Sequence, residues 1–252
     1  MATHPSNHRA ILGSYGVDAP WVPWLWYGLG VLFLVAGSLN LSSGFDVWYV
    51  VSIIYFFGGG IVWIIGGTLY VNATRRGKFQ VWAEVLDDAG LRGDENALDL
   101  GCGRGAVTVA LATRLPRGHV TGIDLWRNVD QSGNNTAATE RNLAMNGVTD
   151  RVTLATADMT ELPFADDTFN IVTASLSIHN VKPAEGRSAA IREAIRVLKP
   201  GGRLLVVDIS RIEEYTKTLG EAGITPSRNA PAGWRMWWSG PWMASRILTA
   251  TK

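Results

Sequence analysis

Two long apolar runs without charged residues occupy the first third of the chain. They extend from Trp21 to Leu41 and from Val47 to Val71. At about 1.5 Å of rise per residue, a helix of either length crosses a hydrocarbon core of roughly 30 Å. The link between them, Ser42 to Asp46, is short. The pattern therefore predicts an antiparallel hairpin of two membrane-spanning helices over residues 21–72.

Aromatic and small residues in these runs are distributed as in membrane helices. Tryptophan and tyrosine gather near both ends and predict interfacial belts, and glycines in the second run predict close packing of the two helices. A hairpin buried inside a soluble protein is the main alternative, although soluble helices seldom run so long without a charged face. A secretory signal peptide fits less well, because no basic segment directly precedes the first run. The aromatic residues are Trp21, Trp24, Trp26, Tyr27, Trp48 and Tyr49, and the glycines are Gly58, Gly59, Gly60, Gly66 and Gly67.

From Phe79 onward, short apolar runs alternate with amphipathic segments. Phe79 to Ala89 has the spacing of a helix, and so has Ala184 to Leu198. Lys199-Pro-Gly-Gly202 is expected to end the second of these helices and to turn the chain into a strand. Such alternation predicts an α/β fold, with a parallel sheet, helices on both faces and ligand sites at the carboxyl ends of the strands. The predicted strands are residues 96–100, 120–124, 152–156, 169–175 and 203–208.

The segment Ala97-Leu-Asp-Leu-Gly-Cys-Gly-Arg-Gly105 joins an apolar strand to an acidic residue and to glycines at alternating positions. Glycines let the backbone approach a ligand closely and adopt conformations that a Cβ forbids. A helix expected to begin near Ala106 would point its positive end at a carboxylate. The spacing Gly101-x-Gly103-x-Gly105 differs from the GxGxxG fingerprint of dinucleotide-binding proteins, which argues against a nicotinamide oxidoreductase.

Two more acidic residues lie at the ends of the next two predicted strands. Asp124 closes the second strand about twenty residues after the glycine turn, where a carboxylate accepts hydrogen bonds from ribose hydroxyls. Asp158, followed by Met159, comes just after the third strand. Each acid taken singly also fits a solvated turn or a helix N-cap. Together with Asp99, they indicate one site at the carboxyl edge of the sheet.

These motifs resemble the class I, Rossmann-like family of S-adenosylmethionine (SAM) methyltransferases of the small-molecule type, and the resemblance covers nearly all of residues 78–252. It implies a seven-stranded sheet and SAM as the cofactor. It also implies that the glycine turn holds the methionine end of SAM, while Asp158 and Met159 hold the adenine. Asn170 stands where the family usually has aspartate, at a mostly structural position. The cofactor-binding residues expected on this basis are Asp99, Gly101, Gly103, Gly105, Asp124, Leu125, Asp158, Met159 and Ser175.

Charge divides the chain of 252 residues into two parts. Only three of its 45 Lys, Arg, Asp and Glu residues precede Ala73, so we expect residues 73–252 to form the methyltransferase domain. A net charge of +1 gives no reason to expect nucleic acid as a partner. Cys102 is the single cysteine, which excludes an intrachain disulfide and a metal site built on several cysteines. No metal is expected.

Basic residues predict the orientation of the hairpin. Arg75, Arg76 and Lys78 follow the second apolar run, whereas the link between the runs has none. By the positive-inside rule, the N-terminal segment (residues 1–20) and the catalytic domain are both cytoplasmic. The sequence thus predicts an integral membrane protein whose catalytic domain lies on the cytoplasmic side of the cell membrane.

The residues that would carry out the chemistry are less evident. Methyl transfer is an in-line displacement that needs an aligned nucleophile and, for some acceptors, a base. His179 follows the fourth predicted strand and is the catalytic candidate; ordering of its loop or lining of the cofactor pocket is the alternative. The candidates for substrate contact are Trp126, Asp130, Asn180 and Trp237. A solvated turn is an equal alternative for the connection that holds Asp130, Gln131 and Asn134. The tail tryptophans either pack around the last strands or touch the membrane interface or an apolar substrate; they are Trp234, Trp237, Trp238 and Trp242.

The expected function is that of a membrane-anchored SAM-dependent methyltransferase acting on a small, hydrophobic or lipid-like acceptor, with the lipid bilayer as a partner. The segment after the fourth strand is neither Asn-Pro-Pro-Tyr nor Asp-Pro-Pro-Tyr, which argues against amino-group methylation of adenine or glutamine. The alternative function is a non-catalytic SAM-binding membrane sensor or scaffold. The acceptor atom and the oligomeric state stay open.

Overall fold

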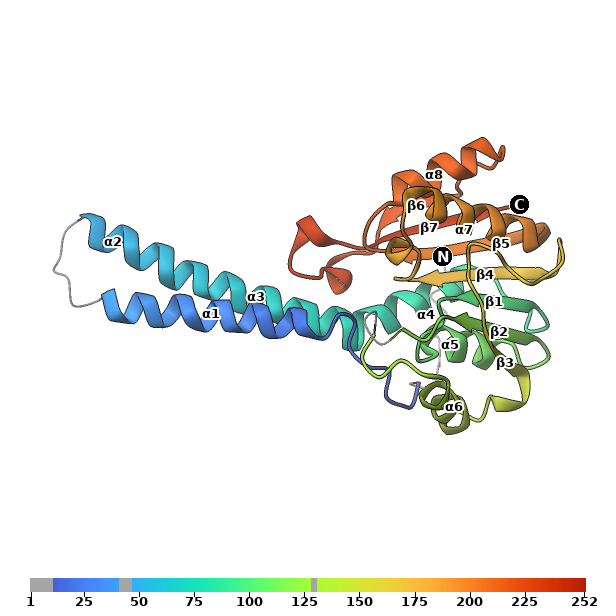
Figure 1. Ribbon diagram of the computed structural model, residues 1–252, viewed down its shortest axis with the longest axis horizontal. Helices are drawn as coiled ribbons and strands as arrows, with labels where there is room; N and C mark the ends of the chain where they lie inside the picture. Colours follow the sequence, from blue (N-terminus) through green and yellow to red (C-terminus); the bar gives the residue numbers. More distant parts are fainter. Residues whose placement is uncertain (1–10, 41–46, 128–130) are drawn as a thin grey trace, which may run out of the picture.

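The computed structural model describes residues 11–40, 47–127 and 131–252. Its C-terminal part is built on a seven-stranded sheet with the strand order β3-β2-β1-β4-β5-β7-β6 (Figure 1). Strands β1 to β5 run parallel, while β7 is antiparallel to both β5 and β6. The strands are β1 (Asn96–Leu100), β2 (His119–Asp124), β3 (Val152–Thr156), β4 (Phe169–Ser175), β5 (Leu198–Asp208), β6 (Arg228–Pro231) and β7 (Arg246–Thr251). This confirms the predicted Rossmann-like α/β sheet.

Helices cover both faces of the sheet, as predicted. Alternate residues of β1 point to opposite faces, so Ala97 packs in one core and Leu98 in the other. The first core includes side chains of α4 (Lys78–Asp88), α5 (Ala106–Arg114) and α6 (Thr136–Met145). The second core includes side chains of α7 (Ala184–Val197) and α8 (Ile212–Glu221). Short helical turns complete the domain: η3 (Thr149–Arg151), η4 (Ile178–Asn180), η5 (Trp234–Met236) and η6 (Pro241–Met243).

The start of β5 differs from the prediction. The turn Lys199-Pro-Gly-Gly202 was expected to precede the strand, but β5 already begins at Leu198, directly after α7. Phe169 pairs with Leu198 and Ile171 pairs with Arg203, so the intervening residues form a bulge in the edge of β5 that faces β4. Gly201 has a φ of +78° there. The prediction was wrong because the Pro-Gly-Gly pattern of a turn is also that of a bulge.

The first apolar run forms α1 (Trp21–Asn40) and the second forms α2 (Val47–Ile53) and α3 (Gly59–Asn72), joined by the π-helical turn η1 (Ile54–Gly58). A second π-helical turn, η2 (Ala73–Gly77), joins α3 to α4. One helix of 42 residues therefore extends from Val47 to Asp88. The chain stays helical across the domain boundary that we expected at residue 72.

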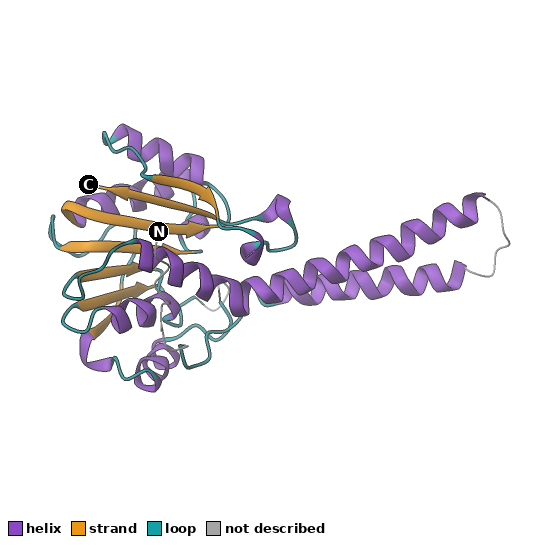
Figure 2. Ribbon diagram, turned by 180° about the vertical axis from the view of Figure 1, so that it is seen from behind, coloured by secondary structure: helices purple, strands orange, loops and turns teal. Residues whose placement is uncertain are grey.

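Helices α1 and α3 pack side by side as an antiparallel pair that projects from the domain (Figure 2). At their closest point, a Cβ on Gly30 would lie 3.2 Å from the carbonyl oxygen of Gly60, so only glycine permits this approach. Gly59, Gly66 and Gly67 lie against aromatic rings of α1. Of the five glycines expected to pack, Gly58 alone faces open space.

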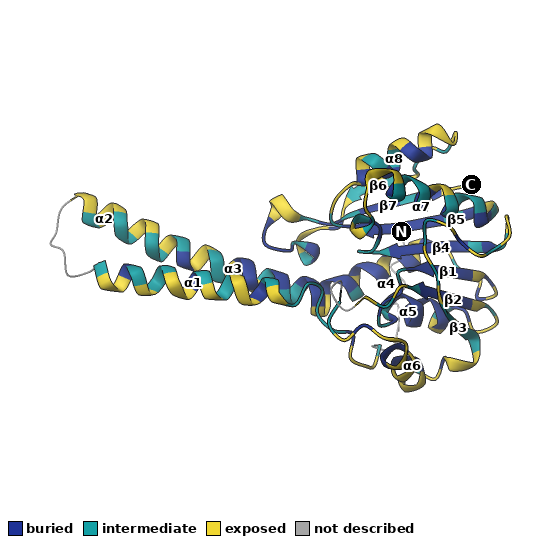
Figure 3. Ribbon diagram, in the orientation of Figure 1, coloured by how far each residue is buried: buried dark blue, intermediate teal, exposed yellow. Residues whose placement is uncertain are grey.

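The outward faces of this hairpin remain apolar and exposed (Figure 3). Leu32 and Leu39 on α1, and Ile54 and Val62 on the second helix, each expose more than half of their surface. Both helices are long and apolar enough to cross a membrane. Because the hairpin projects into its surroundings and is mostly not buried, the alternative of a core hairpin inside a soluble protein does not describe it. The predicted link, residues 42–46, lies outside the described residues.

Candidate functional site

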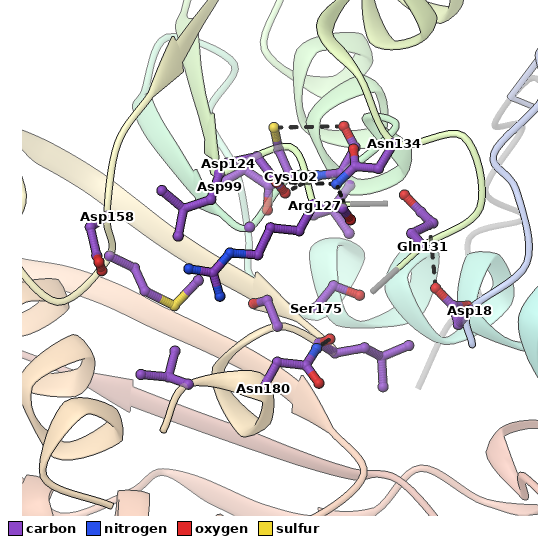
Figure 4. Close-up of a pocket in the computed structure, with 18 of the residues that line it drawn as sticks. Asp18, Asp99, Cys102, Asp124, Arg127, Gln131, Asn134, Asp158, Ser175 and Asn180 are labelled. Carbon is purple, nitrogen blue, oxygen red and sulfur yellow. Dashed lines mark hydrogen bonds between the residues drawn. The ribbon is translucent and has the colours of Figure 1, made fainter. Parts of the chain in front are cut away.

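A cavity of about 610 Å³ lies at the carboxyl ends of β1, β2 and β4, on the edge of the sheet that faces the hairpin (Figures 1 and 4). This is where a doubly wound sheet binds ligands, because the strand order reverses between β1 and β4. Most of the residues predicted to bind the cofactor line this cavity. They are Asp99, Gly101, Gly103, Asp124, Leu125, Asp158, Met159 and Ser175, together with the predicted substrate residue Asn180.

The glycine turn follows β1 and has the backbone conformation that the sequence predicted. Gly101 and Gly103 have φ values of +68° and +51°. A Cβ on Gly101 would lie 2.4 Å from Cβ of Ser177, and one on Gly103 would lie 2.5 Å from Oε1 of Gln131. Both glycines thus keep the cavity floor free of side-chain atoms.

Gly105 has a different role from the other two glycines. It is the N-cap of α5, with a φ of +82°, and does not line the cavity. A Cβ there would lie 2.9 Å from Cγ2 of Thr139 on α6. Gly105 therefore sets the packing of α5 on α6, and its predicted contact with the cofactor stays a prediction.

Asp99 is the most deeply buried acid of the cavity, with 1% of its surface exposed. Its carboxylate accepts hydrogen bonds from the hydroxyls of Thr108 (2.7 Å) and Thr173 (2.8 Å). Burial, with a smaller contribution from Asp124, raises the pKa of Asp99 to about 6. A cationic group in the cavity would favour the ionised form of this carboxylate.

Asp124 closes β2 and faces the same cavity. It accepts hydrogen bonds from the backbone N–H of Gly103 (2.8 Å) and of Trp126 (2.6 Å), and from Nδ2 of Asn134 (3.1 Å). Asn134 is 3% exposed, and its Oδ1 is buried without a hydrogen-bond partner among the described residues. Since a buried acceptor costs free energy when it is left unpaired, Oδ1 is suited to a hydroxyl or amine donor of a ligand in this cavity.

The segment after β3, which was predicted to hold the adenine, forms one side of the cavity. Asp158 and Met159 line it, and Oδ1 of Asp158 accepts hydrogen bonds from the backbone and hydroxyl of Thr160. On the opposite side, Oγ of Ser175 accepts a hydrogen bond from Nε1 of Trp82 on α4 (2.8 Å). Asp158 and Ser175 therefore lie on two sides of one space, as Figure 4 shows.

Two site residues come from parts of the chain that the sequence did not assign to the site. Asp18, from the predicted cytoplasmic segment, and Lys78, at the start of α4, both line the cavity. Nζ of Lys78 lies 2.9 Å from Oδ2 of Asp18, and Thr74 donates a hydrogen bond to the same oxygen (2.6 Å). The Lys78 side chain is only 5% exposed. Local patterns could not reveal this pair, because its partners are 60 residues apart.

Gln131 joins this pair to the glycine turn. Its Nε2 donates to the carbonyl oxygen of Tyr15 (3.0 Å), and its Oε1 accepts from the backbone N–H of Arg104 (3.0 Å). The N-terminal strap, which we define as residues 11–18, thereby lies against the cavity wall. Asn142 on α6 and Asn146, the C-cap of that helix, hold the strap through its backbone groups.

Besides Gly105, three predicted site residues do not line the cavity in the described part of the chain: Trp126, His179 and Trp237. Nδ1 of His179 on η4 lies 2.5 Å from Oδ1 of the buried Asp208, which orients the ring beside the cavity. Trp126 donates through Nε1 to Thr156 (2.9 Å) on the outer side of β3. Trp237 lies in the loop between β6 and β7, away from the cavity, so the structure does not support a substrate contact there. Asp130 falls outside the described residues.

Comparison with known proteins shows what this region is similar to. A family model described as "Methyltransferase domain" matches residues 98–206. A demethylmenaquinone methyltransferase of Staphylococcus aureus (strain JH9) is 37% identical over 134 residues, which are 52% of this chain and 51% of the relative. The chain thus spans about half the length of the curated relatives it matches.

Solved structures resemble the domain at lower identity. The cyclase SpnF aligns with a TM-score of 0.58 at 23% identity, over 69% of this chain and 80% of its own. A SAM-dependent methyltransferase from Aquifex aeolicus has a TM-score of 0.53 at 20% identity, over 68% and 88% of the two chains. A geranyl diphosphate C-methyltransferase from Streptomyces coelicolor A3(2) has a TM-score of 0.56 at 17% identity, over 68% and 78%. The domain match and the curated relative support a SAM-dependent methyltransferase domain with S-adenosylmethionine as its cofactor, and the solved structures show that the chain shares the fold of such proteins.

Proposed function

We propose that this protein is a membrane-anchored methyltransferase that transfers the methyl group of SAM to a small, hydrophobic or lipid-like acceptor. The observation that carries the proposal is the position of the cavity. It opens at the edge of the sheet that faces an apolar, outwardly exposed hairpin (Figure 1). An acceptor dissolved in a bilayer around the hairpin would be concentrated on this side of the domain.

The residues of the cavity fit SAM. Bound SAM supplies an activated sulfonium methyl group. The backbone at Gly101 and Gly103 leaves the space that a methionine chain would need, and Asp99 would hold the cationic amino group. Asp124 and the unpaired Oδ1 of Asn134 would accept the ribose hydroxyls, while Asp158 would accept a hydrogen bond from the adenine amino group.

The relatives support a hydrophobic acceptor. Two of the relatives described above carry names that specify demethylmenaquinone or geranyl diphosphate as the substrate. Both names describe molecules with prenyl chains. The acceptor of this chain is proposed to share that apolar character, without being identified with either molecule.

Basic residues support the proposed topology. Arg75 and Arg76 are exposed at the point where the second helix leaves its apolar run. Positive charges gather on the cytoplasmic side of membrane helices, so residues 1–20 and 73–252 are proposed to be cytoplasmic and residues 21–72 to span the membrane. The catalytic domain would then lie beneath the inner leaflet.

An acceptor screen tests the proposal. Purified full-length protein is incubated with SAM and with quinones, prenyl diphosphates, lipids, thiols or amines, and release of S-adenosylhomocysteine is followed. Release that depends on one acceptor class supports the proposal. SAM binding without product from any class would favour a non-catalytic sensor or scaffold. The fold by itself does not decide, since the cyclase SpnF shares it.

His179 is the proposed base, held by Asp208. Replacing His179 with Ala should lower the methyl-transfer rate about 10²-fold or more while leaving SAM affinity unchanged. His119 lies at the amino end of β2, away from the cavity, so His119→Ala is the matched control. If His179→Ala transferred methyl groups at the unchanged rate, the His179 side chain would have only a structural role.

A further inference from the structure

The loop between β6 and β7, residues 232–245, contains a cluster of exposed aromatic side chains that the domain does not bury. Trp234 exposes 61% of its surface and Trp242 exposes 70%, and Met243 is also exposed. Side chains of this size are rarely left exposed together on one loop unless the loop has a partner. Neither tryptophan lines the cavity, so the proposed reaction does not account for them.

The β6–β7 loop is held firmly in place. Between the exposed residues, Trp238 is buried, packs its ring 5.0 Å from that of Tyr70 on α3, and donates through Nε1 to Ser245 (2.8 Å). Arg235 forms a two-fold ion pair with Glu84 on α4, at 2.6 and 2.7 Å. The exposure of the tryptophans is therefore a feature of a fixed surface.

Gly77 explains how the loop comes so close to the second helix. A Cβ on Gly77 would lie 1.8 Å from the carbonyl oxygen of Arg235, which leaves no room for any other residue. The backbone of the loop thus rests directly on η2. This contact aligns the loop with the helix at the place where the helix leaves its apolar run.

The loop extends along the helix into the apolar region. A Cβ on Gly66 would lie 3.4 Å from the carbonyl oxygen of Ser239 and 2.5 Å from the ring of Trp26. Gly66 precedes Arg75 by nine residues, so the loop reaches about 14 Å beyond this basic residue along the helix axis. Figures 1 and 2 show the loop beside the base of the hairpin.

The exposed tryptophans of the loop lie at the same end of the hairpin as two exposed tryptophans of α1. Trp21 exposes 63% of its surface and Trp24 exposes 77%. Tryptophan favours the boundary between headgroups and acyl chains, where its ring is apolar and its N–H can be hydrated. Two segments more than 200 residues apart in the sequence thus present exposed tryptophans near the base of the hairpin.

We infer that the β6–β7 loop inserts into the headgroup and acyl boundary of the bilayer and is a membrane contact in addition to the hairpin. The inference rests on the proposed membrane anchor. Because the loop is fixed against α3 and η2, its insertion would seat this side of the domain in the membrane interface. The second contact would thereby hold the carboxyl edge of the sheet, with the cavity, toward the bilayer surface.

Site-specific fluorescence tests this inference in the full-length protein. An environment-sensitive dye is attached at Trp242→Cys, and in a second variant at Trp234→Cys. Leu32→Cys on α1 is the positive control, and Lys217→Cys, 80% exposed on α8, is the aqueous control. Cys102 is buried and burial raises the pKa of its thiol, so the unsubstituted chain serves as the labelling blank. Each variant must bind SAM like the unsubstituted chain.

The labelled proteins are reconstituted in phosphatidylcholine and phosphatidylglycerol vesicles with or without acyl-chain nitroxide lipids. We expect the labels at positions 242 and 234 to be blue-shifted and quenched several-fold more strongly than the label at 217. Quenching at 32 without quenching at 242 and 234 would overturn the inference and leave the anchor intact. Absence of quenching at 32 as well would overturn the anchor, and the inference with it.

Discussion

Replacing Gly101 with alanine tests whether the glycine turn is shaped for a cofactor. The new Cβ would lie 2.4 Å from Cβ of Ser177, whereas carbon atoms in contact are normally about 3.5–4.0 Å apart. The two groups must therefore separate by more than about 1 Å. Ser177 resists this movement, because its hydroxyl donates a hydrogen bond to the carbonyl oxygen of Leu100 (2.8 Å). The turn itself has to move.

The magnitude follows from three contributions. A φ of +68° costs a residue with a Cβ about 1–2 kcal/mol, and overpacking adds about 1–3 kcal/mol. Lower entropy of the unfolded chain offsets about 0.4–1 kcal/mol. The free energy of unfolding should thus fall by about 1–5 kcal/mol, with a central value of about 3 kcal/mol. If displacement of the turn must be reversed on SAM binding at a cost of half that central value, SAM affinity falls by about tenfold.

Gly147→Ala is the matched control. Gly147 has nearly the same φ, +64°, but no atom lies within 4 Å of its Cβ position, and it does not line the cavity. It isolates the conformational cost, about 1 kcal/mol or less after the offset. Calorimetric SAM titration and thermal unfolding in detergent are measured for both variants. If Gly101→Ala had the SAM affinity of the unsubstituted chain and the same unfolding temperature as Gly147→Ala, the turn would not be the constraint we describe.

Two further predictions concern charged groups of the site. Because burial raises the pKa of Asp99 to about 6, the folded protein binds more protons than the unfolded chain between the usual carboxyl pKa and that value. The stability of the protein without SAM should therefore decline as the pH rises through this window. SAM affinity should fall as the pH drops below about 6, by at most tenfold per pH unit. Asp99→Asn should remove both trends, and a trend that persists in this variant would belong to another group. Asp18→Asn leaves the buried ammonium of Lys78 without its counter-charge and should lower the free energy of unfolding by about 3 kcal/mol. Asp94→Asn, which removes the exposed ion pair with Arg92, is the control and should lower the free energy of unfolding by at most about 1 kcal/mol. Thermal unfolding measures both variants, and equal losses of stability would refute the argument from the buried pair.

The sequence predicted the central sheet well because each parallel strand is a short apolar run that ends in a turn or an acid. The two C-terminal strands were expected from the family resemblance, but no residue ranges were predicted for them. β6 is Arg-Asn-Ala-Pro, which has the composition of a turn, and it is a strand only because it pairs with β7 at the edge of the sheet. Pairing of this kind depends on tertiary contacts.

The site was predicted where its residues lie on strand ends and missed where they come from distant segments. Asp99, Asp124 and Asp158 are brought together by parallel pairing alone. Asp18 was placed in a cytoplasmic segment without a role in the site, although it lines the cavity. Trp237 was predicted to contact substrate, with packing around the last strands or contact with the membrane interface as alternatives. It lies in the β6–β7 loop and does not line the cavity, a position that spacing along the chain does not encode.

The hairpin and the cavity are parts of one continuous structure. The helix that contains α3 carries Thr74 and Lys78, and both contact Asp18 of the segment just before α1. Asp18 in turn lies beside Gln131, whose Oε1 is the atom that a Cβ on Gly103 would meet. A tilt of the helix relative to the domain would disturb these contacts and leave the mostly buried Lys78 ammonium without its counter-charge. The glycine turn is thus positioned in part by the helix that leaves the apolar hairpin, and a domain cut off at Lys78 would lack groups that complete its own cofactor cavity.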